Sequence, residues 1–547
     1  MKLSLSKTCT AVLLALPLLA AGLPTSAHDD SPLSNVPAAN KKAPGYAPAH
    51  MLSPELRQAP VVQGSVALEN PEGIVTHYGY QNDTPSPSDP TLPQMVPGTT
   101  PAVEAQKTEP DKNTYLVLRD QKGADPDYDY GTHFLFQGHE LGVQGRSYIT
   151  RINLDADSAH RVTLMATHDV NGSPIAPIDG STWDPFAQRL LFTTENPGAP
   201  TYAATLDVPS RVEDVSGALG RGGYEGIQND NFGNVWIVED VSGANKAGTA
   251  ARRPNSFLYR YVPRTPGDLH NGKLQVLQVL NSANQPITFE SQAALNSPDQ
   301  LALHTYGVSF RTNWVTIHDT AVNGNAPFDS NALAKAAHGT PFKRPENGVF
   351  RPGTSFREFF FDETGDTNAN SPENGTAGGW TSIFKLTQAN AAADHGALTL
   401  FFHSKSATVA GLDNISFLSR DTLLVVEDAG DTLHTQRNAL DSGFAFDANH
   451  DYSDGALPVR FLAEGRDPSA TLDSANGGFV KNEGDNEITG IHVSDGDPSI
   501  HGVLGAKNPR FGQDGWRMFW TQQHGDNFTW EVTPAQRKDD DNNNDQR

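Results

Sequence analysis

Cysteine is almost absent from this chain of 547 residues, in which the only example is Cys9. Residues 1–27 have the form of a secretory signal peptide, with Lys2 and Lys7 followed by an apolar stretch from Ala11 to Leu23 and a small-residue cleavage site. We therefore expect the mature chain to contain no thiol. That absence excludes disulfides, zinc-thiolate sites, haem attachment and cysteine nucleophiles together.

Long apolar runs are also missing beyond this signal. No later stretch approaches the roughly 20 apolar residues that a membrane-spanning helix needs. No twin arginine precedes the apolar run, and no cysteine follows it to take a lipid anchor. These absences predict export by the general secretory route, to the periplasm or the medium, and no membrane partner.

Positive charge is scarce as well. The formal net charge is −24, and loss of the two signal lysines leaves −26 for residues 28–547. Such a surface repels nucleic acid and anionic membranes, so we expect neither as a partner. If the substrate is an anion, bound cations must reverse the local field. We expect a small substrate and a monomeric protein.

One structural unit recurs in the sequence: a turn, a short apolar run and acidic residues where the run ends. β-Branched and aromatic residues fill the runs, and Gly, Asn or Asp separate them, which is typical of strand, tight turn and strand. The last acids are Glu195, Glu239 and Glu427, so the spacings are 44 residues and then 188, close to four steps of about 47. The three stretches are 179–196, 223–240 and 412–428.

A period of 40–50 residues made of short strands is typical of a β-propeller blade. Strands that converge on a central channel bring acids from remote blades together, and clustered carboxylates favour a hard divalent cation, with calcium the first candidate. The alternative is that each acidic pair ends an exposed strand with solvated charge. The sequence thus predicts an all-β fold, a single β-propeller of about six blades with inserted loops and few short helices.

The propeller is assigned to residues 70–535. Residues 28–69 are rich in Pro, Ala, Ser and Asn and predict a disordered or loosely packed lead-in. Residues 536–547 predict a disordered acidic tail. Few helices are expected, chiefly at 329–338 and 387–394, as inserts.

Several blocks resemble the PhoX-type alkaline phosphatases, secreted calcium-dependent propeller enzymes. The strongest runs from Leu219 through Glu225 and a strand ending in Glu239 and Asp240 to Pro263. The resemblance covers about residues 110–530. Further blocks, in the order of the family, are Phe136 to Leu141, Phe342 to Glu346, Leu412 to Asn414, Asn486 to Gly490 and Phe519 to Gly525.

The resemblance implies phosphate monoester hydrolysis at a channel mouth that holds iron and calcium. It makes Arg344 the phosphate-binding residue and a catalytic group together with Glu346, and it suggests His139 and His524 as substrate contacts. An arginine fork suits phosphate oxygens better than lysine does. The alternatives are a rim salt bridge for Arg344 and a structural hydrogen bond for His139. The predicted metal ligands are Glu195, Glu225, Glu239, Asp240, Glu346 and Glu487.

One departure from the family concerns the metal. Where family members carry Thr-Cys-Glu-Glu-Asn, with the cysteine on iron, this chain has Thr193-Thr194-Glu195-Asn196. A threonine hydroxyl is a poor replacement for a thiolate, so we expect calcium and doubt iron. Tyr224 also replaces the family histidine before Glu225.

The leading hypothesis is therefore a secreted calcium-dependent, phosphatase-like propeller that hydrolyses phosphate esters at an acidic metal cluster. Two alternatives stay open. One is a propeller that keeps calcium for stability and binds a ligand or partner without turnover. The other is a calcium-dependent lactonase or esterase that uses the same acidic channel.

Overall fold

The structure is a computed structural model, and its strands dominate the fold, which confirms the predicted all-β class. None of the described helices has the length and apolar character that a membrane crossing needs. The predicted signal peptide and acidic tail lie outside the described residues. The residues described are 33–37, 50–64, 66–79, 108–140, 147–288, 297–465, 487–523 and 527–535, together with the backbone of 95–96 and 103–104.

Three antiparallel sheets contain four or five strands each in simple up-and-down order. The first has β7 (Pro110–Val117), β8 (His133–His139), β9 (Ile149–Asn153) and β10 (Val162–Ala166). The second has β11 (Ser181–Asp184), β12 (Arg189–Phe192), β13 (Tyr202–Ala204) and β14 (Val212–Asp214). The third has β24 (Leu412–Phe417), β25 (Thr422–Glu427), β26 (Ser442–Asp447), β27 (Val459–Ala463) and β1 (Met51–Leu52).

A nine-stranded sheet joins two such units through one long strand, β19 (Ser309–Asp319), which pairs with β18 on one side and β23 on the other. One unit has β15 (Tyr224–Asn229), β16 (Val235–Glu239), β17 (Leu258–Pro263) and β18 (Gly272–Leu280). The other has β20 (Gly348–Phe350), β21 (Glu358–Glu363), β22 (Ser382–Gln388) and β23 (His395–His403).

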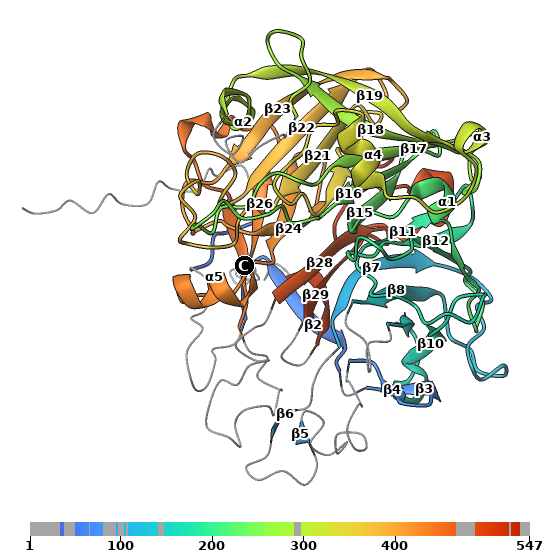
Figure 1. The fold of residues 1–547 in the computed structure, drawn as a ribbon. Helices are drawn as coiled ribbons and strands as arrows, with labels where there is room; N and C mark the ends of the chain where they lie inside the picture. Colours follow the sequence, from blue (N-terminus) through green and yellow to red (C-terminus); the bar gives the residue numbers. More distant parts are fainter. Residues whose placement is uncertain are drawn as a thin grey trace, which may run out of the picture.

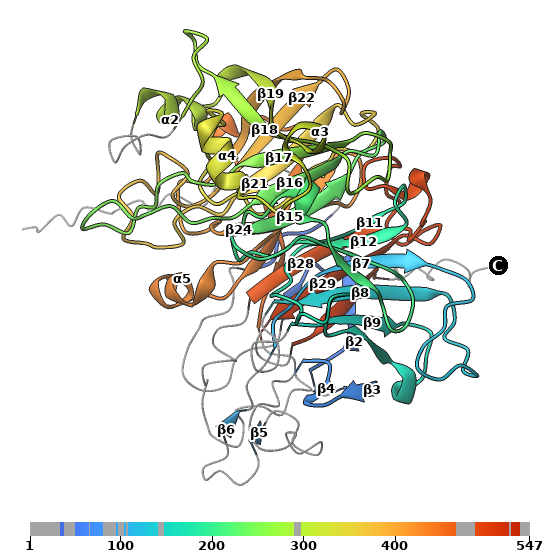
Figure 2. The ribbon, with the colours of Figure 1, turned by 45° about the vertical axis from the view of Figure 1, so that its right-hand side comes forward.

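The first strands of these units form a closed ring. Contacts run from β7 to β11, β11 to β15, β15 to β20, β20 to β24, β24 to β28 and β28 back to β7. The strands fan outward from this centre in Figures 1 and 2. The ring brings the starts of six distant segments to one axis.

The last sheet is completed by the N-terminal part of the chain. Strand β2 (Leu56–Val62) pairs with β30 (Thr529–Pro534), which follows β29 (Arg517–Gln523) and β28 (Glu487–Ser494). The expectation of a disordered or loosely packed lead-in over 28–69 is therefore wrong for residues 51–52 and 56–62, which form β1 and β2. Residues 56–62 show no regular alternation of apolar and polar side chains, and they form a strand because their backbone pairs with the otherwise open edge of β30.

Hydrophobic cores lie between neighbouring sheets. Phe134 and Phe136 of β8 pack with Leu190 and Phe192 of β12, for example. Within the nine-stranded sheet, the buried Trp236 meets three aromatic rings edge-on or tilted at 4.8–5.1 Å between centroids. Because each sheet buries both faces, no sheet is stable without its neighbours.

Helices are short inserts. The helix expected at 329–338 is confirmed as α4 (Ser330–Ala336), capped by the Asp329 carboxylate. The expected helix at 387–394 is wrong, because this segment ends β22 and turns into β23, where the cross-strand pairing outweighs the local helix preference. The other helices of the described residues are α1 (Ser216–Leu219), α2 (Pro298–Leu303), α3 (Thr320–Asn323) and α5 (Gly430–Arg437). Short 3-10 turns lie at Ser158–His160, Tyr452–Asp454 and Ile500–Gly502. Two hairpins pair β3 (Ala67–Glu72) with β4 (Val75–His77) and β5 (Met95–Val96) with β6 (Val103–Glu104).

Replacing Leu56 by Ala tests the N-terminal closure. Leu56 is buried where β2 meets β30, so the substitution should lower the free energy of unfolding by about 2–5 kcal/mol. Val322→Ala, at a side chain that is 80% exposed, should change it by less than about 0.5 kcal/mol. Chemical denaturation measures both. Equal effects would mean that residues 56–62 do not close the last sheet.

Candidate metal centre

The inner strand ends converge on a cavity of about 210 Å³. Ten of its twelve lining residues are acidic, and they come from every unit of the ring. The lining residues are Glu109, Asp111, Glu140, Asp179, Glu195, Glu225, Arg344, Glu346, Asp413, Asp428, Glu487 and Gln523.

β-Bulges aim several of these carboxylates. In three of the innermost strands the pairing register shifts directly after the first paired residue, and an acid is the first residue of the irregular stretch. A bulge bends the strand and redirects a side chain that regular pairing would point elsewhere. The acids at these equivalent positions are Asp111, Glu225 and Asp413.

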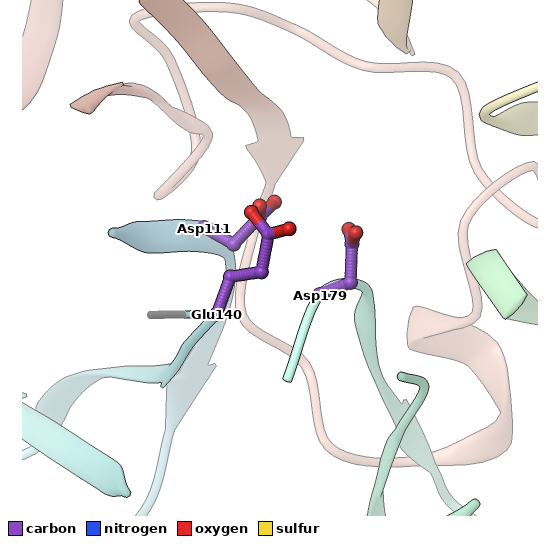
Figure 3. Close-up of side chains that lie close together, drawn as sticks. All are labelled: Asp111, Glu140 and Asp179. Carbon is purple, nitrogen blue, oxygen red and sulfur yellow. The ribbon is translucent and has the colours of Figure 1, made fainter. Parts of the chain in front are cut away.

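Two groups of three carboxylates are close enough to share a cation. Oxygens of Asp111, Glu140 and Asp179 lie within 4.8 Å of one another. Figure 3 shows the three side chains: Asp111 lies in β7, Glu140 directly follows β8, and Asp179 lies just before β11. Glu225, Glu346 and Asp413 form the second group with the same spread. Each group draws on more than one sheet, so the ring must close before either can form.

The electrostatics of the cavity disfavour so many bare charges. Burial, followed by repulsion from neighbouring carboxylates, raises the pKa of Glu140 to about 8 and raises those of Asp179 and Glu225 well above their ordinary values. Asp179 Oδ1 is buried with no hydrogen-bond partner. Without cations, several of these groups must hold protons at neutral pH.

Arg344 is the one cation that lines the cavity in the described part of the chain. Its Nη2 lies 2.8 Å from Asp240 Oδ2 and 3.2 Å from Glu346 Oε1. Burial alone would lower the pKa of its guanidinium, but these two carboxylates raise it well above the ordinary value. Arg344 also has φ of 54°, a left-handed conformation that is costly for a side chain of this size. The backbone is thus strained at the residue that faces the acids.

A second cation, Lys112, lies beneath the cavity. Its Nζ donates to Asn347 Oδ1 at 3.0 Å, and Asn347 Nδ2 donates in turn to Asp413 Oδ1 at 3.2 Å. Lys112 is the residue after Asp111 and sits within the bulge of β7. No signal in the sequence distinguished it from a surface lysine.

Most of the predicted site residues are brought together. Glu195, Glu225, Glu346, Glu487 and Arg344 all line the cavity. Asp240 lies directly behind it, where it holds the Arg344 guanidinium through Nε and Nη2. The alternative that Arg344 only makes a rim salt bridge therefore describes one of its contacts but not its place in the cavity wall.

Glu239 lies apart from this cavity. Its Oε2 accepts hydrogen bonds from the Phe257 backbone N–H at 3.0 Å, the Tyr259 hydroxyl at 2.9 Å and Asn331 Nδ2 at 3.1 Å. These contacts attach β17 and the α4 insert to the end of β16. Glu239 therefore ties the end of β16 to its neighbours and does not line the cavity, whereas the next residue, Asp240, contacts Arg344 in the cavity wall.

The two histidines have different outcomes. His139 is fully buried, stacks on Tyr148 at 4.1 Å and contacts the hydroxyls of Thr108 and Thr150 at 3.1 Å. Burial lowers its pKa to about 3, and it does not line the cavity, so the hydrogen-bonding alternative describes it. His524 lies outside the described residues.

Six of the ten acids in the cavity were not among the predicted site residues. Glu140 follows His139 in a block already noted, Asp413 lies in the Leu412 to Asn414 block, and Asp428 follows Glu427 in a repeat. Those three had a readable signal, and so did Asp179, which begins the first repeat. Glu109 and Asp111 had none, because a Pro-rich stretch precedes them and β7 is recognisable only through its pairing with β8.

The donor set fits a hard cation. Every candidate ligand is a carboxylate oxygen, the donor type that calcium prefers, and the described residues offer no thiolate. Thr194, in the place of the family cysteine, is buried and donates its hydroxyl to the Pro200 carbonyl at 2.9 Å. The reason to doubt a family-type iron site, the lack of a thiolate ligand, therefore still holds for the described residues.

Comparison with known proteins gives a likeness in fold rather than in sequence. No family model and no curated protein sequence matches the chain. Among solved structures, Pseudomonas fluorescens PhoX in complex with vanadate, a transition-state analogue, matches over 92% of this chain and 98% of its own, with a TM-score of 0.51 and 10% identity.

Two further structures are more distant. A gluconolactonase from Xanthomonas campestris matches 65% of this chain and 86% of its own at a TM-score of 0.24 and 11% identity. Saccharomyces cerevisiae Sqt1 matches 78% and 99% at a TM-score of 0.29 and 8% identity. Neither likeness is close enough to carry an argument. Taken with the closed ring of inner strands, the comparison with PhoX shows that this chain has a PhoX-like fold.

Proposed function

We propose that the protein is a six-bladed β-propeller that hydrolyses small phosphate esters with calcium bound in its acidic central cavity. The nine-stranded sheet counts as two blades, β15 to β18 and β20 to β23, linked at the outer edge by β19. Export and a monomeric state remain predictions from the sequence.

The observation that carries the proposal is one arginine among ten carboxylates. A purely acidic cavity would suit cations alone, whereas a guanidinium fork at its wall matches the oxygens of a phosphoryl group. The strained backbone at Arg344 supports a role that needs this position rather than one that serves stability.

The side chains of this chain have separable roles in that reaction. Glu225, Glu346 and Asp413 would hold one cation, and Asp111, Glu140 and Asp179 another. Bound cations would reverse the repulsion of an anionic substrate and stabilise charge on the transferring phosphoryl group. Asp240 and Glu346 fix the Arg344 guanidinium, so that its free N–H groups point at one place without further ordering.

A calcium-binding propeller without turnover is the second candidate. The observation in its favour is Thr194, whose hydroxyl is already used by the backbone and leaves no replacement for the family thiolate. The two candidates share the metal sites and differ only in hydrolysis.

Replacing Arg344 by Ala should lower kcat/KM for p-nitrophenyl phosphate by about 10–150-fold. The reason is the loss of about 1.5–3 kcal/mol of charge-assisted hydrogen bonding to the phosphoryl oxygens. Steady-state kinetics at saturating calcium measures it, with Arg264→Ala, at a side chain that is 59% exposed, as the control. Unchanged kinetics would remove Arg344 from substrate binding, and absence of hydrolysis by the wild type would favour the second candidate.

Glu225→Gln and Glu239→Gln form a matched pair. Both residues were predicted ligands, but only Glu225 lines the cavity. Glu225→Gln should weaken calcium affinity by about 10–100-fold or more, since a charged oxygen donor is lost. Glu239→Gln should leave the affinity near that of the wild type. Calcium titration calorimetry checks both, and equal losses would contradict the assignment of the cavity as the metal centre.

The stability of the metal-free protein should fall as the pH rises from about 4.5 to about 8. Glu140 has its pKa raised from 4.5 to about 8, so the folded chain keeps a proton that the unfolded chain releases in this range. Denaturation in a chelator at several pH values measures the slope, and calcium should flatten it. A stability that rises with pH in the chelator would show that the carboxylates are not crowded.

A further inference from the structure

A second cavity, of about 260 Å³, is lined by residues of β25, β26 and β27 and of helix α5, the helix that lies beside this sheet in Figure 1. It is separate from the acidic cavity, and the two share no lining residue. Its wall contains two arginines and one glutamate. The lining residues are Ala407, Thr408, Glu427, Arg437, Ala439, Ser442 and Arg460.

Arg437 and Glu427 neutralise each other. Arg437 Nη1 and Nη2 each lie 3.1 Å from an oxygen of Glu427, and Nη2 lies 2.9 Å from Asp441 Oδ1. Glu427 also accepts from the backbone N–H groups of Ala410 at 2.8 Å and Ser442 at 2.9 Å. The one carboxylate of the wall therefore has its oxygens occupied.

The other arginine of the wall, Arg460, has only neutral hydrogen-bond partners for its guanidinium among the described residues. Its residue is 8% exposed, yet no acidic group of the described residues lies within ion-pairing distance. Its Nε donates to Ser442 Oγ at 3.1 Å and its Nη2 to the Thr408 carbonyl at 3.2 Å, both neutral acceptors. The guanidinium also lies 5.2 Å from the centroid of Phe444. Five N–H donors cannot be satisfied by two neutral acceptors.

A buried cation without a counter-ion is costly unless an anion completes it. Burial is the first cause that lowers the pKa of Arg460, and nearby Arg437 lowers it further, while Glu427 offsets only part. We propose that this cavity is a binding site for a small oxyanion, a phosphate or carboxylate group, held by the Arg460 fork and the hydroxyl groups of Ser442 and Thr408. The class follows from the planar fork, which matches two oxygens of one such group.

The site does not depend on the proposed hydrolysis. Asp428, the residue after Glu427, lines the acidic cavity, so the two sites lie on either side of the end of β25. An oxyanion held here would sit against the same strand end as the metal centre.

Thermal unfolding of the protein as purified, titrated with inorganic phosphate and separately with acetate, tests the proposal. The melting temperature of the wild type should rise to a plateau with at least one of these anions. Arg460→Gln should lose that response. Arg351→Gln should keep it, because Arg351 is as buried but already pairs with Glu358 at 3.3 Å and Asp421 at 2.7 Å. A rise in melting temperature with phosphate alone, with acetate alone or with both would show which of the two oxyanion types the site binds.

An equal response in Arg460→Gln, or no saturable response in the wild type with either anion, would overturn the site. Should Arg460→Gln fail to fold, Thr408→Glu decides, because Thr408 is exposed at the rim and a tethered carboxylate there would take the place of the anion. This variant should melt at a higher temperature than the wild type without added anion and should no longer respond to it. A variant that responds as the wild type does would equally reject the site.

Discussion

Mutual repulsion among carboxylates is the constraint around which this structure is arranged. Closure of the ring from β7 through β28 brings ten acids to one cavity, although each would be better solvated on an open surface. The apolar cores between neighbouring sheets supply the stability that this arrangement needs. Packing elsewhere therefore offsets the repulsion among the carboxylates, and bound cations or protons must neutralise the remaining negative charge.

At the ends of β16 and β25, two adjacent acids make different contacts. At the end of β16, Glu239 ties the neighbouring strand and the α4 insert, while Asp240 reaches toward Arg344. At the end of β25, Glu427 holds Arg437, while Asp428 lines the cavity. Since successive side chains of an extended chain point in opposite directions, one acid of each pair anchors the blade and the next serves the centre.

Three basic side chains at or near these strand ends differ in their partners. Arg344 enters the cavity wall between Asp240 and Glu346, and Lys112 lies below, joined through Asn347 to Asp413. Arg460 stands outside, beyond the end of β25, where no acid of the described residues pairs with it. The first two are compensated within the protein, and the third is left for a ligand. Anion recognition and metal binding would then occupy opposite sides of one strand end.

The sequence by itself determined the all-β class, the repeating unit and some of the acids at the strand ends, because apolar runs and turn residues are local properties of the chain. It also predicted helix α4, whose cap and length are local. The tertiary structure alone decided which acid of each pair faces inward, since that depends on bulges and on cross-strand register. It alone decided that residues 56–62 close the last sheet, because their partner strand is Thr529–Pro534, near the other end of the chain. Lys112 and Arg460 acquire their roles only from the charges that folding places, or fails to place, around them.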